Sequence, residues 1–291
     1  MHMFSTICAL ALAAALWLAN AGNPFAHAQR AGSESPAAAL AYLGFDSNDY
    51  PGDAALPVLR RTFSFAGYWL NPPPGTASNT WAGKRAVLRE GGFGFLVLFN
   101  GRTSRQLRRP ADAATLGARD ARIAADRAKQ EGFSMGTVIF LDQEEGGRLL
   151  PEQRDYLFSW IDGVIAAGFD PGVYCSGIPA KEGKREFIVT ANDIRDHAGA
   201  RNIAFFVYND ECPPSPGCVC EKSPPLPSAS GVLYASVWQF SQSPRRQEFT
   251  SRCARTYSPD GNCYPPGTAG PGPIFLDLDS ATSSDPSHGR C

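Results

Sequence analysis

The sequence of 291 residues has almost no net charge and few histidines. Its 27 basic side chains are balanced by 28 acidic ones, which gives a formal net charge of −1. A nucleic-acid-binding protein normally presents a basic face, so this balance argues against nucleic acid as a partner. Four arginines do lie close together, at positions 102, 105, 108 and 109, but such a cluster is typical of a solvated loop.

The shortage of histidine also restricts the chemistry. Only His197 and His288 lie beyond the first 28 residues, so Cys175 and Ser176 have no evident histidine partner and a nucleophilic triad is not expected. The same shortage gives little support for a histidine-based metal site. The sequence has no G-x-G-x-x-G turn and no phosphate loop, and no cofactor is predicted.

A long apolar run occurs only at the N-terminus. Residues 7–19, ICALALAAALWLA, have the length of a signal peptide and are short for a transmembrane span. Ala26, His27 and Ala28 form a small-x-small pattern that predicts cleavage before Gln29. We expect a signal peptide over 1–28, a flexible lead-in over 29–39, and a secreted or periplasmic protein with no membrane association after cleavage. No basic residue precedes the run, so an uncleaved anchor is the alternative.

Cysteine, in contrast, is frequent. One of the eight cysteines lies in the expected signal peptide, and five of the others lie between 212 and 263, where Pro and Gly are dense. In an oxidising compartment these cysteines would tie a long loop by disulfide bonds. Cys175 is far from the others in sequence and is the candidate for an unpaired thiol. A zinc site at Cys212, Cys218 and Cys220 is not expected, because their spacing is C-x5-C-x-C rather than C-x2-C.

Short apolar runs recur along the remaining chain and predict eight strands, at 41–46, 65–70, 94–100, 136–142, 172–176, 203–210, 234–240 and 273–279. Helical periodicity predicts helices over 114–131 and 151–167, and weaker ones over 80–90 and 190–200. Strands that alternate with helices pair in parallel through right-handed crossovers.

We therefore predict an α/β fold with the architecture of a (β/α)8 TIM-like barrel. The barrel would be a single domain over 40–285, with a disulfide-tied loop insertion after strand six and a C-terminal tail over 286–291. An open, doubly wound sheet is the alternative, which the missing G-x-G-x-x-G turn disfavours.

Acidic residues gather where the predicted strands end, which is where barrels of this kind carry their active sites. They are Asp46, Asp142, Glu144, Asp210, Asp277 and Asp279. Side chains alternate along a strand, so Asp142 and Glu144 would share one side, with Cα atoms about 6.6 Å apart. Glu145 has the opposite parity and is the weaker candidate. Asp46 as a helix cap, and Asp277 and Asp279 as ordinary strand-end charges, are the structural alternatives.

Aromatic and amide side chains occupy the same strand ends and are candidates for substrate binding: Tyr68, Asn100, Tyr174, Tyr208, Asp210, Trp238 and Gln239. Taken singly, residues such as Tyr174 and Trp238 are more often packing residues than ligand contacts. Carboxylates can act as proton donor, base or nucleophile at a glycosidic bond, and aromatic faces pack against sugar rings. The combination therefore favours carbohydrate chemistry.

Five motifs carry a resemblance to a known family. They are GFDS at 44–47, FLDQE at 140–144, GVYCSG at 172–177, VWQFS at 237–241 and FLDLD at 275–279. These motifs resemble the strand ends of family 25 glycoside hydrolases, the lysozyme-like muramidases. They are more similar still to the related glycoside-hydrolase-like family known as domain of unknown function 1906. The resemblance covers residues 41–282 and implies a barrel fold.

The resemblance implies roles for individual residues. Glu144 would be the general acid that protonates the leaving oxygen, and Asp142 would stabilise the developing charge or activate water or the substrate's acetamido group. Asp46 and Asp277 would complete an acidic floor, and Tyr174, Trp238 and Gln239 would line the sugar groove. The implied partner is a polysaccharide, peptidoglycan or a related glycan. The chain departs from the lysozymes in Glu145, in the Gly146–Gly147 pair and in the cysteine-rich insertion.

Two other functions stay open at this point. One is a non-catalytic glycan-binding or envelope-associated barrel module. The other is a cation-dependent hydrolase in which Asp46, Asp142, Glu144 and Asp277 are the oxygen ligands of a hard metal ion. For the glycoside hydrolase, clustered acids predict raised pKa values and an acid-shifted activity optimum.

Overall fold

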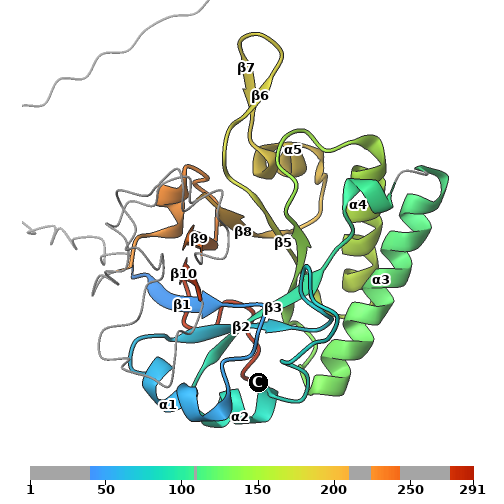
Figure 1. Cartoon of the computed structure of the whole chain (residues 1–291). Coiled ribbons are helices and arrows are strands. Elements are labelled where there is room, and N and C mark those ends of the chain that lie inside the picture. The colour runs from blue at the N-terminus through green and yellow to red at the C-terminus, as the bar shows by residue number, and fades with distance from the viewer. Residues whose placement is uncertain (1–39, 108–109, 210–223, 243–275) are drawn as a thin grey trace, which may run out of the picture. The chain divides into compact units, whose positions relative to one another are not determined.

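The computed structural model describes residues 40–107, 110–209, 224–242 and 276–291. In this part of the chain eight strands form a closed barrel in the order β1-β10-β9-β8-β5-β4-β3-β2 (Figure 1). The strands are β1 (Tyr42–Asp46), β2 (Phe65–Trp69), β3 (Gly94–Asn100), β4 (Val138–Gln143), β5 (Asp170–Ser176), β8 (Ala204–Tyr208), β9 (Val237–Ser241) and β10 (Asp277–Ala281). The predicted barrel is confirmed, and each predicted strand overlaps one of these.

The direction of the last strand was not predicted correctly. Seven of the barrel strands pair in parallel with one another, but β10 is antiparallel to both of its neighbours, β9 and β1. A strand buried on both faces has the same apolar pattern in either direction, so its sequence does not reveal its orientation. The reversal brings the first residue of β10, Asp277, opposite the last residue of β1, Asp46.

Two long helices cover one side of the barrel, α3 (Pro110–Glu131) and α4 (Pro151–Ala166), and both were predicted. They lie side by side (Figure 1), and glycines set their separation. A Cβ atom on Gly163 would lie 2.6 Å from the Cβ atom of Ala121, and one on Gly117 would lie 2.2 Å from the Tyr156 carbonyl oxygen. Neither position can hold a larger side chain without moving the helices apart.

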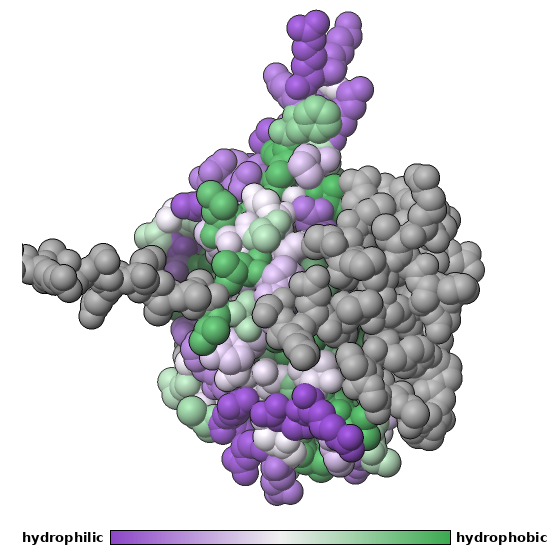
Figure 2. Space-filling model, turned by 90° about the vertical axis from the view of Figure 1, so that its left-hand side faces the viewer, coloured by the Kyte–Doolittle hydropathy of each residue, from purple (hydrophilic) through white to green (hydrophobic). Residues whose placement is uncertain are grey.

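The other helical segments are short. They are α1 (Leu56–Leu59), α2 (Arg85–Glu90), α5 (Thr190–His197) and three 3₁₀ turns, Asp53–Ala55, Ser104–Gln106 and Pro227–Ser230. A two-stranded hairpin that was not predicted, β6 (Ala180–Glu182) and β7 (Glu186–Ile188), projects beyond the end of β5 (Figure 1). Its surface is mainly hydrophilic (Figure 2).

The end of the chain packs against the start of β3 and β4. Asp285 accepts a hydrogen bond from the Phe95 amide at 2.8 Å, and the fully buried Ser287 hydroxyl accepts one from the Val97 amide at 2.8 Å. The Val138 amide donates to the Ser287 carbonyl oxygen at 2.9 Å. The C-terminal segment, including residues predicted as a tail, is therefore bound to the barrel at the end opposite to the carboxyl ends of these strands.

Within the described residues, Cys175 is buried, Cys291 is exposed, and neither forms a disulfide bond. Cys175 was expected to be unpaired. The other cysteines, the predicted disulfide-tied insertion and the predicted signal peptide lie outside the described residues. None of the helices in the described ranges combines the length and apolar character needed to span a bilayer.

Candidate functional site

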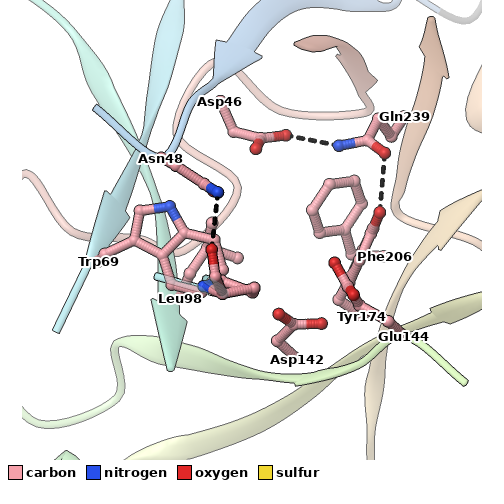
Figure 3. Close-up of a pocket in the computed structure, with 10 residues that line it drawn as sticks. Asp46, Asn48, Trp69, Leu98, Asp142, Glu144, Tyr174, Phe206 and Gln239 are labelled. Atoms are coloured by element: carbon pink, nitrogen blue, oxygen red, sulfur yellow. Dashed lines mark hydrogen bonds between the residues drawn. The ribbon is translucent and has the colours of Figure 1, made fainter. Parts of the chain in front are cut away.

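A pocket opens at the end of the barrel where the parallel strands terminate. It is lined by Asp46, Asn48, Trp69, Pro74, Leu98, Asp142, Glu144, Tyr174, Phe206 and Gln239 (Figure 3). Its cavity volume of about 10 Å³ is close to the space that one water molecule needs. The pocket therefore combines three carboxylates with an apolar wall.

The carboxylates lie on two sides of this pocket. Asp142 is the next-to-last residue of β4, and Glu144 follows the strand directly. In Figure 3 these two side chains lie on one side of the pocket and Asp46, from the end of β1, lies on the other, next to Gln239. The buried strand segment before Asp142, Val138 to Leu141, holds the pair at the barrel mouth because it cannot leave the core.

The connection that carries Glu144 is bound to neighbouring elements. The Tyr208 hydroxyl donates to the Glu144 carbonyl oxygen at 2.7 Å. Further along, the Gly147 amide donates to the Thr190 hydroxyl at 2.8 Å, and the Leu149 amide donates to the buried Asp193 carboxylate at 3.0 Å. These bonds attach the connection to β8 at Glu144 itself and to α5 shortly after it.

Glu145 serves a different purpose from Glu144. Its carboxylate accepts hydrogen bonds from the Ser104 amide and hydroxyl, both at 2.8 Å, and from the Gln153 side chain at 2.5 Å. It therefore joins the connection after β3 to the start of α4. It does not line the pocket.

A hydrogen-bond chain links the pocket wall to the acids of β1 and β10. The Tyr174 hydroxyl donates to Gln239 Oε1 at 2.7 Å. The Gln239 amide nitrogen then donates to Asp46 at 2.8 Å and to Asp277 at 3.4 Å. Asp277 thus reaches the site from the N-terminal end of an antiparallel strand, although the sequence prediction placed it at the C-terminal end of a parallel one.

Gly67 on β2 makes room for Asp46. A Cβ atom at position 67 would lie 2.5 Å from the Asp46 Cβ atom, which is far inside van der Waals contact. Any side chain on this residue would displace Asp46 or the strand that carries it. The GFD motif therefore depends on a glycine in the neighbouring strand.

Asp279 lies one inward position beyond Asp277 on β10 and is fully buried. Burial raises the pKa of this carboxyl well above its usual value, and the nearby Asp46 and Asp277 carboxylates raise it further. Asp279 was not among the predicted catalytic residues. The available signal was its i, i+2 spacing from Asp277, which puts both acids on the same side of a strand.

Two of the predicted substrate-binding aromatics lie away from the pocket. Tyr68 is fully buried, and its hydroxyl donates to Glu131 at the end of α3 at 2.5 Å. Trp238 packs against Phe240 with ring centroids 5.8 Å apart, and its indole nitrogen donates to the Asn209 carbonyl oxygen at 3.3 Å. The alternation of side chains explains both placements, because their sequence neighbours Trp69 and Gln239 occupy the inward positions.

The remaining predicted residues support the pocket or lie elsewhere. Asn100 donates to the Pro72 carbonyl oxygen at 2.9 Å and so holds the connection after β2. Tyr208 holds the Glu144 carbonyl, as above, and its ring lies 5.5 Å from that of Tyr174. Asp210 lies outside the described residues.

Trp69 and Asn48 line the pocket but were not predicted. The Trp69 indole nitrogen donates to the Ser47 carbonyl oxygen at 3.2 Å, and the Asn48 amide donates to the Pro74 carbonyl oxygen at 3.0 Å. All five residues of β2 are buried. Hydrophobicity therefore gave no reason to choose Trp69 over Tyr68 as the inward aromatic.

The described residues contain no group of three or more His, Cys, Asp or Glu side chains arranged to hold a metal ion. The cation-dependent alternative required Asp46, Asp142, Glu144 and Asp277 to converge on one ion. The acids are divided between two sides of the pocket instead, as Figure 3 shows for the first three.

Comparisons with known proteins support the fold. No family model matches the chain, and no curated protein matches it. An uncharacterized protein of B. stearothermophilus is similar in structure, with a TM-score of 0.52 and 18% identity over 82% of this chain and 95% of that one. A Tat-secreted protein of Mycobacterium tuberculosis has a TM-score of 0.48 and 14% identity, over 86% and 97% of the two chains. The spore cortex lytic enzyme SleM of Clostridium perfringens has a TM-score of 0.47 and 15% identity, over 84% and 68%.

Of these likenesses, the one to the B. stearothermophilus protein shows a shared fold. It says nothing about chemistry, so the functional argument rests on the residues of the pocket. The resemblance to the family 25 glycoside hydrolases and their relatives stays a prediction, while the barrel that it implied is confirmed by the strand order.

Proposed function

We propose that the protein is a glycoside hydrolase that acts on a polysaccharide of the cell envelope, peptidoglycan or a related glycan. The observation that carries this proposal is the convergence of Asp46, Asp142 and Glu144 on one pocket at the active end of a barrel. Hydrolysis of a glycosidic bond needs a pair of carboxyl groups beside the scissile oxygen. The apolar pocket wall, which includes Trp69, Leu98 and Phe206, suits the C–H face of a sugar.

The positions of the acids suggest a division of labour. Glu144 protonates the leaving oxygen as the general acid. Asp142, on the same side of the pocket, stabilises the developing positive charge or activates water or the acetamido group of the substrate. Asp46 and Asp277 form the acidic floor, and Tyr174 and Gln239 fix the orientation of Asp46 through the hydrogen-bond chain.

The bound backbone around Glu144 supports this assignment. A catalytic side chain must be held to within a fraction of an ångström, since small displacements cost large factors in rate. The Tyr208 hydroxyl contacts the carbonyl of Glu144 itself. Export by the predicted signal peptide is part of the proposal, because a cell-envelope glycan lies outside the cytoplasm.

The test is release of reducing ends from peptidoglycan and from a panel of other glycans by the purified protein. Glu144→Gln keeps the shape of the side chain and removes its proton chemistry, so turnover should fall by at least about 100-fold, the usual worth of a general acid. Glu186→Gln, on the projecting hairpin, is the matched control and should leave turnover unchanged. Thermal unfolding of both variants checks that they fold.

Turnover of the same glycan by Glu144→Gln at the wild-type rate would contradict the role of Glu144. No turnover of any glycan by the wild-type protein would contradict the enzymatic proposal as a whole.

A second candidate is a glycan-binding module without catalysis, which would bind a sugar with the same carboxylates and apolar wall. This candidate predicts saturable glycan binding in calorimetry with no release of reducing ends.

A further inference from the structure

Asp279 is enclosed by the groups that form the floor of the site. In the barrel register it lies opposite Gly44 on β1 and opposite Gln239 on β9. Directly opposite residues on paired strands have their side chains on the same face, so Asp279 shares the barrel interior with Gln239. Its side chain has no solvent exposure.

The charged groups that face Asp279 from the packed strands are both acids. Asp46 approaches from β1 and Asp277 from β10 itself, and the neutral amide of Gln239 approaches from β9. Three carboxylates this close in a buried space cannot all be ionised, because like charges in a low dielectric repel strongly. At least one of them must hold a proton.

The orientation of the Gln239 side-chain amide indicates which of the three carboxyl groups holds the proton. The Tyr174 hydroxyl and the Gln242 amide both donate to Gln239 Oε1, at 2.7 and 2.8 Å. This turns the Gln239 NH₂ group toward Asp46, to which it donates as Figure 3 shows, and toward Asp277, to which it also donates. Donated hydrogen bonds favour the ionised form of these two acids.

Asp279 has the opposite environment. No N–H or O–H group of the described residues donates to either of its oxygens, so none of these residues offsets the cost of burying its negative charge by a hydrogen bond. A protonated Asp279 can instead donate to Asp46, the neighbour with which its side chain interacts.

We propose that Asp279 is the neutral carboxylic acid of the site and a positioning residue, whose proton is shared with Asp46 and fixes the Asp46 carboxylate beside the pocket. The pairing of β1 with β10 thus gives Asp46 a hydrogen-bond donor, Asp279, in place of water. This inference rests on the proposed function for its catalytic meaning, but the protonation itself does not depend on any activity.

Infrared difference spectroscopy of the full protein tests the protonation. At neutral pH the wild-type spectrum should contain the carbonyl stretch of a neutral carboxylic acid, and Asp279→Asn should lack it. Asp126→Asn, at an exposed position of α3, is the control and should retain the band. Absence of the band in the wild type, or its persistence in Asp279→Asn, would overturn the proposal.

A second variant covers the case in which Asp279→Asn does not fold. In Asp46→Asn the partner of the proton changes from a carboxylate to an amide, which is a weaker acceptor, so the band should move to higher frequency. A band at the same frequency in wild type and Asp46→Asn would show that the proton is not shared with Asp46.

The pH dependence of thermal unfolding gives an independent readout. The pKa of Asp279 is raised in the folded state, whereas in the unfolded chain it is about 3.9. The stability associated with its protonation is therefore complete below that pH and is lost as the pH rises toward the folded pKa. Asp279→Asn should gain Tm relative to wild type as the pH rises above about 4, and parallel Tm curves would contradict the proposal.

Measurements of kcat distinguish a positioning role of Asp279 from a role in packing alone. Asp279→Asn keeps a donor for Asp46 and should retain most of the kcat for reducing-end release, whereas the similar-sized Asp279→Leu should lose most of it. Equal kcat in the two variants would reject positioning. A wild-type protein that shows the infrared band but no activity would reject the proposed function and leave the neutral acid intact.

Discussion

Gly67 is the residue on which the position of Asp46 depends most directly. Substitution by alanine places a Cβ atom 2.5 Å from the Asp46 Cβ. Overpacking of this kind costs about 1–3 kcal/mol of unfolding free energy. A displacement of a catalytic group by about 1 Å can lower the rate by about 100-fold. We therefore expect Gly67→Ala to lose far more kcat in the glycan assay than its modest loss of stability would suggest.

Gly172→Ala is the matched control for this prediction. Its Cβ atom would lie 2.4 Å from the Phe140 ring, so it overpacks the barrel interior without touching Asp46. It should lose a similar amount of stability in denaturant titration and keep more of the activity. If both variants lose activity in proportion to stability, the link between Gly67 and Asp46 is contradicted.

At the same scale, the sequence predicts some pocket residues well and others poorly. Asp46, Asp142 and Glu144 stand out because charge at the end of a buried strand is rare. The sequence does not show which of Tyr68 and Trp69 points into the barrel. Both faces of β2 are buried, so its hydrophobic pattern does not separate inward from outward positions. Asp279 was not given a catalytic role because the family resemblance assigned one to Asp277 and not to Asp279.

At the scale of elements, the contact between α3 and α4 depends on Gly163. Alanine is a better helix former than glycine by about 1 kcal/mol, which alone would make Gly163→Ala stabilising. The new Cβ atom would, however, lie 2.6 Å from the Ala121 Cβ, and such overpacking costs about 1–3 kcal/mol. We expect the clash to dominate, so that Gly163→Ala lowers the free energy of unfolding measured in denaturant.

A double variant isolates this contact. Ala121→Gly removes the opposing Cβ atom, so Ala121→Gly combined with Gly163→Ala should recover stability relative to Gly163→Ala alone, even though glycine is the poorer helix former. Additive losses in the double variant would show that the two helices do not meet at these positions.

The same helices show why element prediction succeeds where it does. Residues 151–167 have an apolar stripe at helical spacing and a proline at the first position, and α4 begins at Pro151. The hairpin of β6 and β7 gave no such signal. Its strands are three residues each and largely exposed, so neither alternation nor hydrophobicity marks them.

At the scale of the whole barrel, closure depends on a strand and a segment that the repeating β-α pattern does not explain. β10 closes the barrel in the antiparallel direction, which the alternation of strands and helices did not predict. The eight strands were predicted from eight short apolar runs along the chain. The number of strands therefore follows from the sequence, while the closing geometry follows from the long-range pairing of β1 with β10.

The C-terminal segment stabilises the barrel from the end away from the pocket. The Asp285 carboxylate accepts backbone hydrogen bonds from Phe95 at 2.8 Å, from Gly289 at 3.1 Å and from Arg290 at 3.0 Å. Hydrogen bonds to a charged group contribute about 1.5–3 kcal/mol, so Asp285→Ala should lower the free energy of unfolding by about 3 kcal/mol. Asp285→Asn retains one acceptor and should lose less.

The functional consequence of this variant distinguishes a stabilising segment from one that shapes the site. Phe95 and the pocket residue Leu98 lie toward opposite ends of β3, and the pocket acids are held by contacts to Tyr208 and Gln239 that Asp285 does not share. At temperatures well below its Tm, Asp285→Ala should therefore retain the wild-type kcat for glycan hydrolysis while unfolding at lower denaturant concentration. A fall in kcat under conditions where the variant is fully folded would show that the two ends of the barrel are coupled through β3.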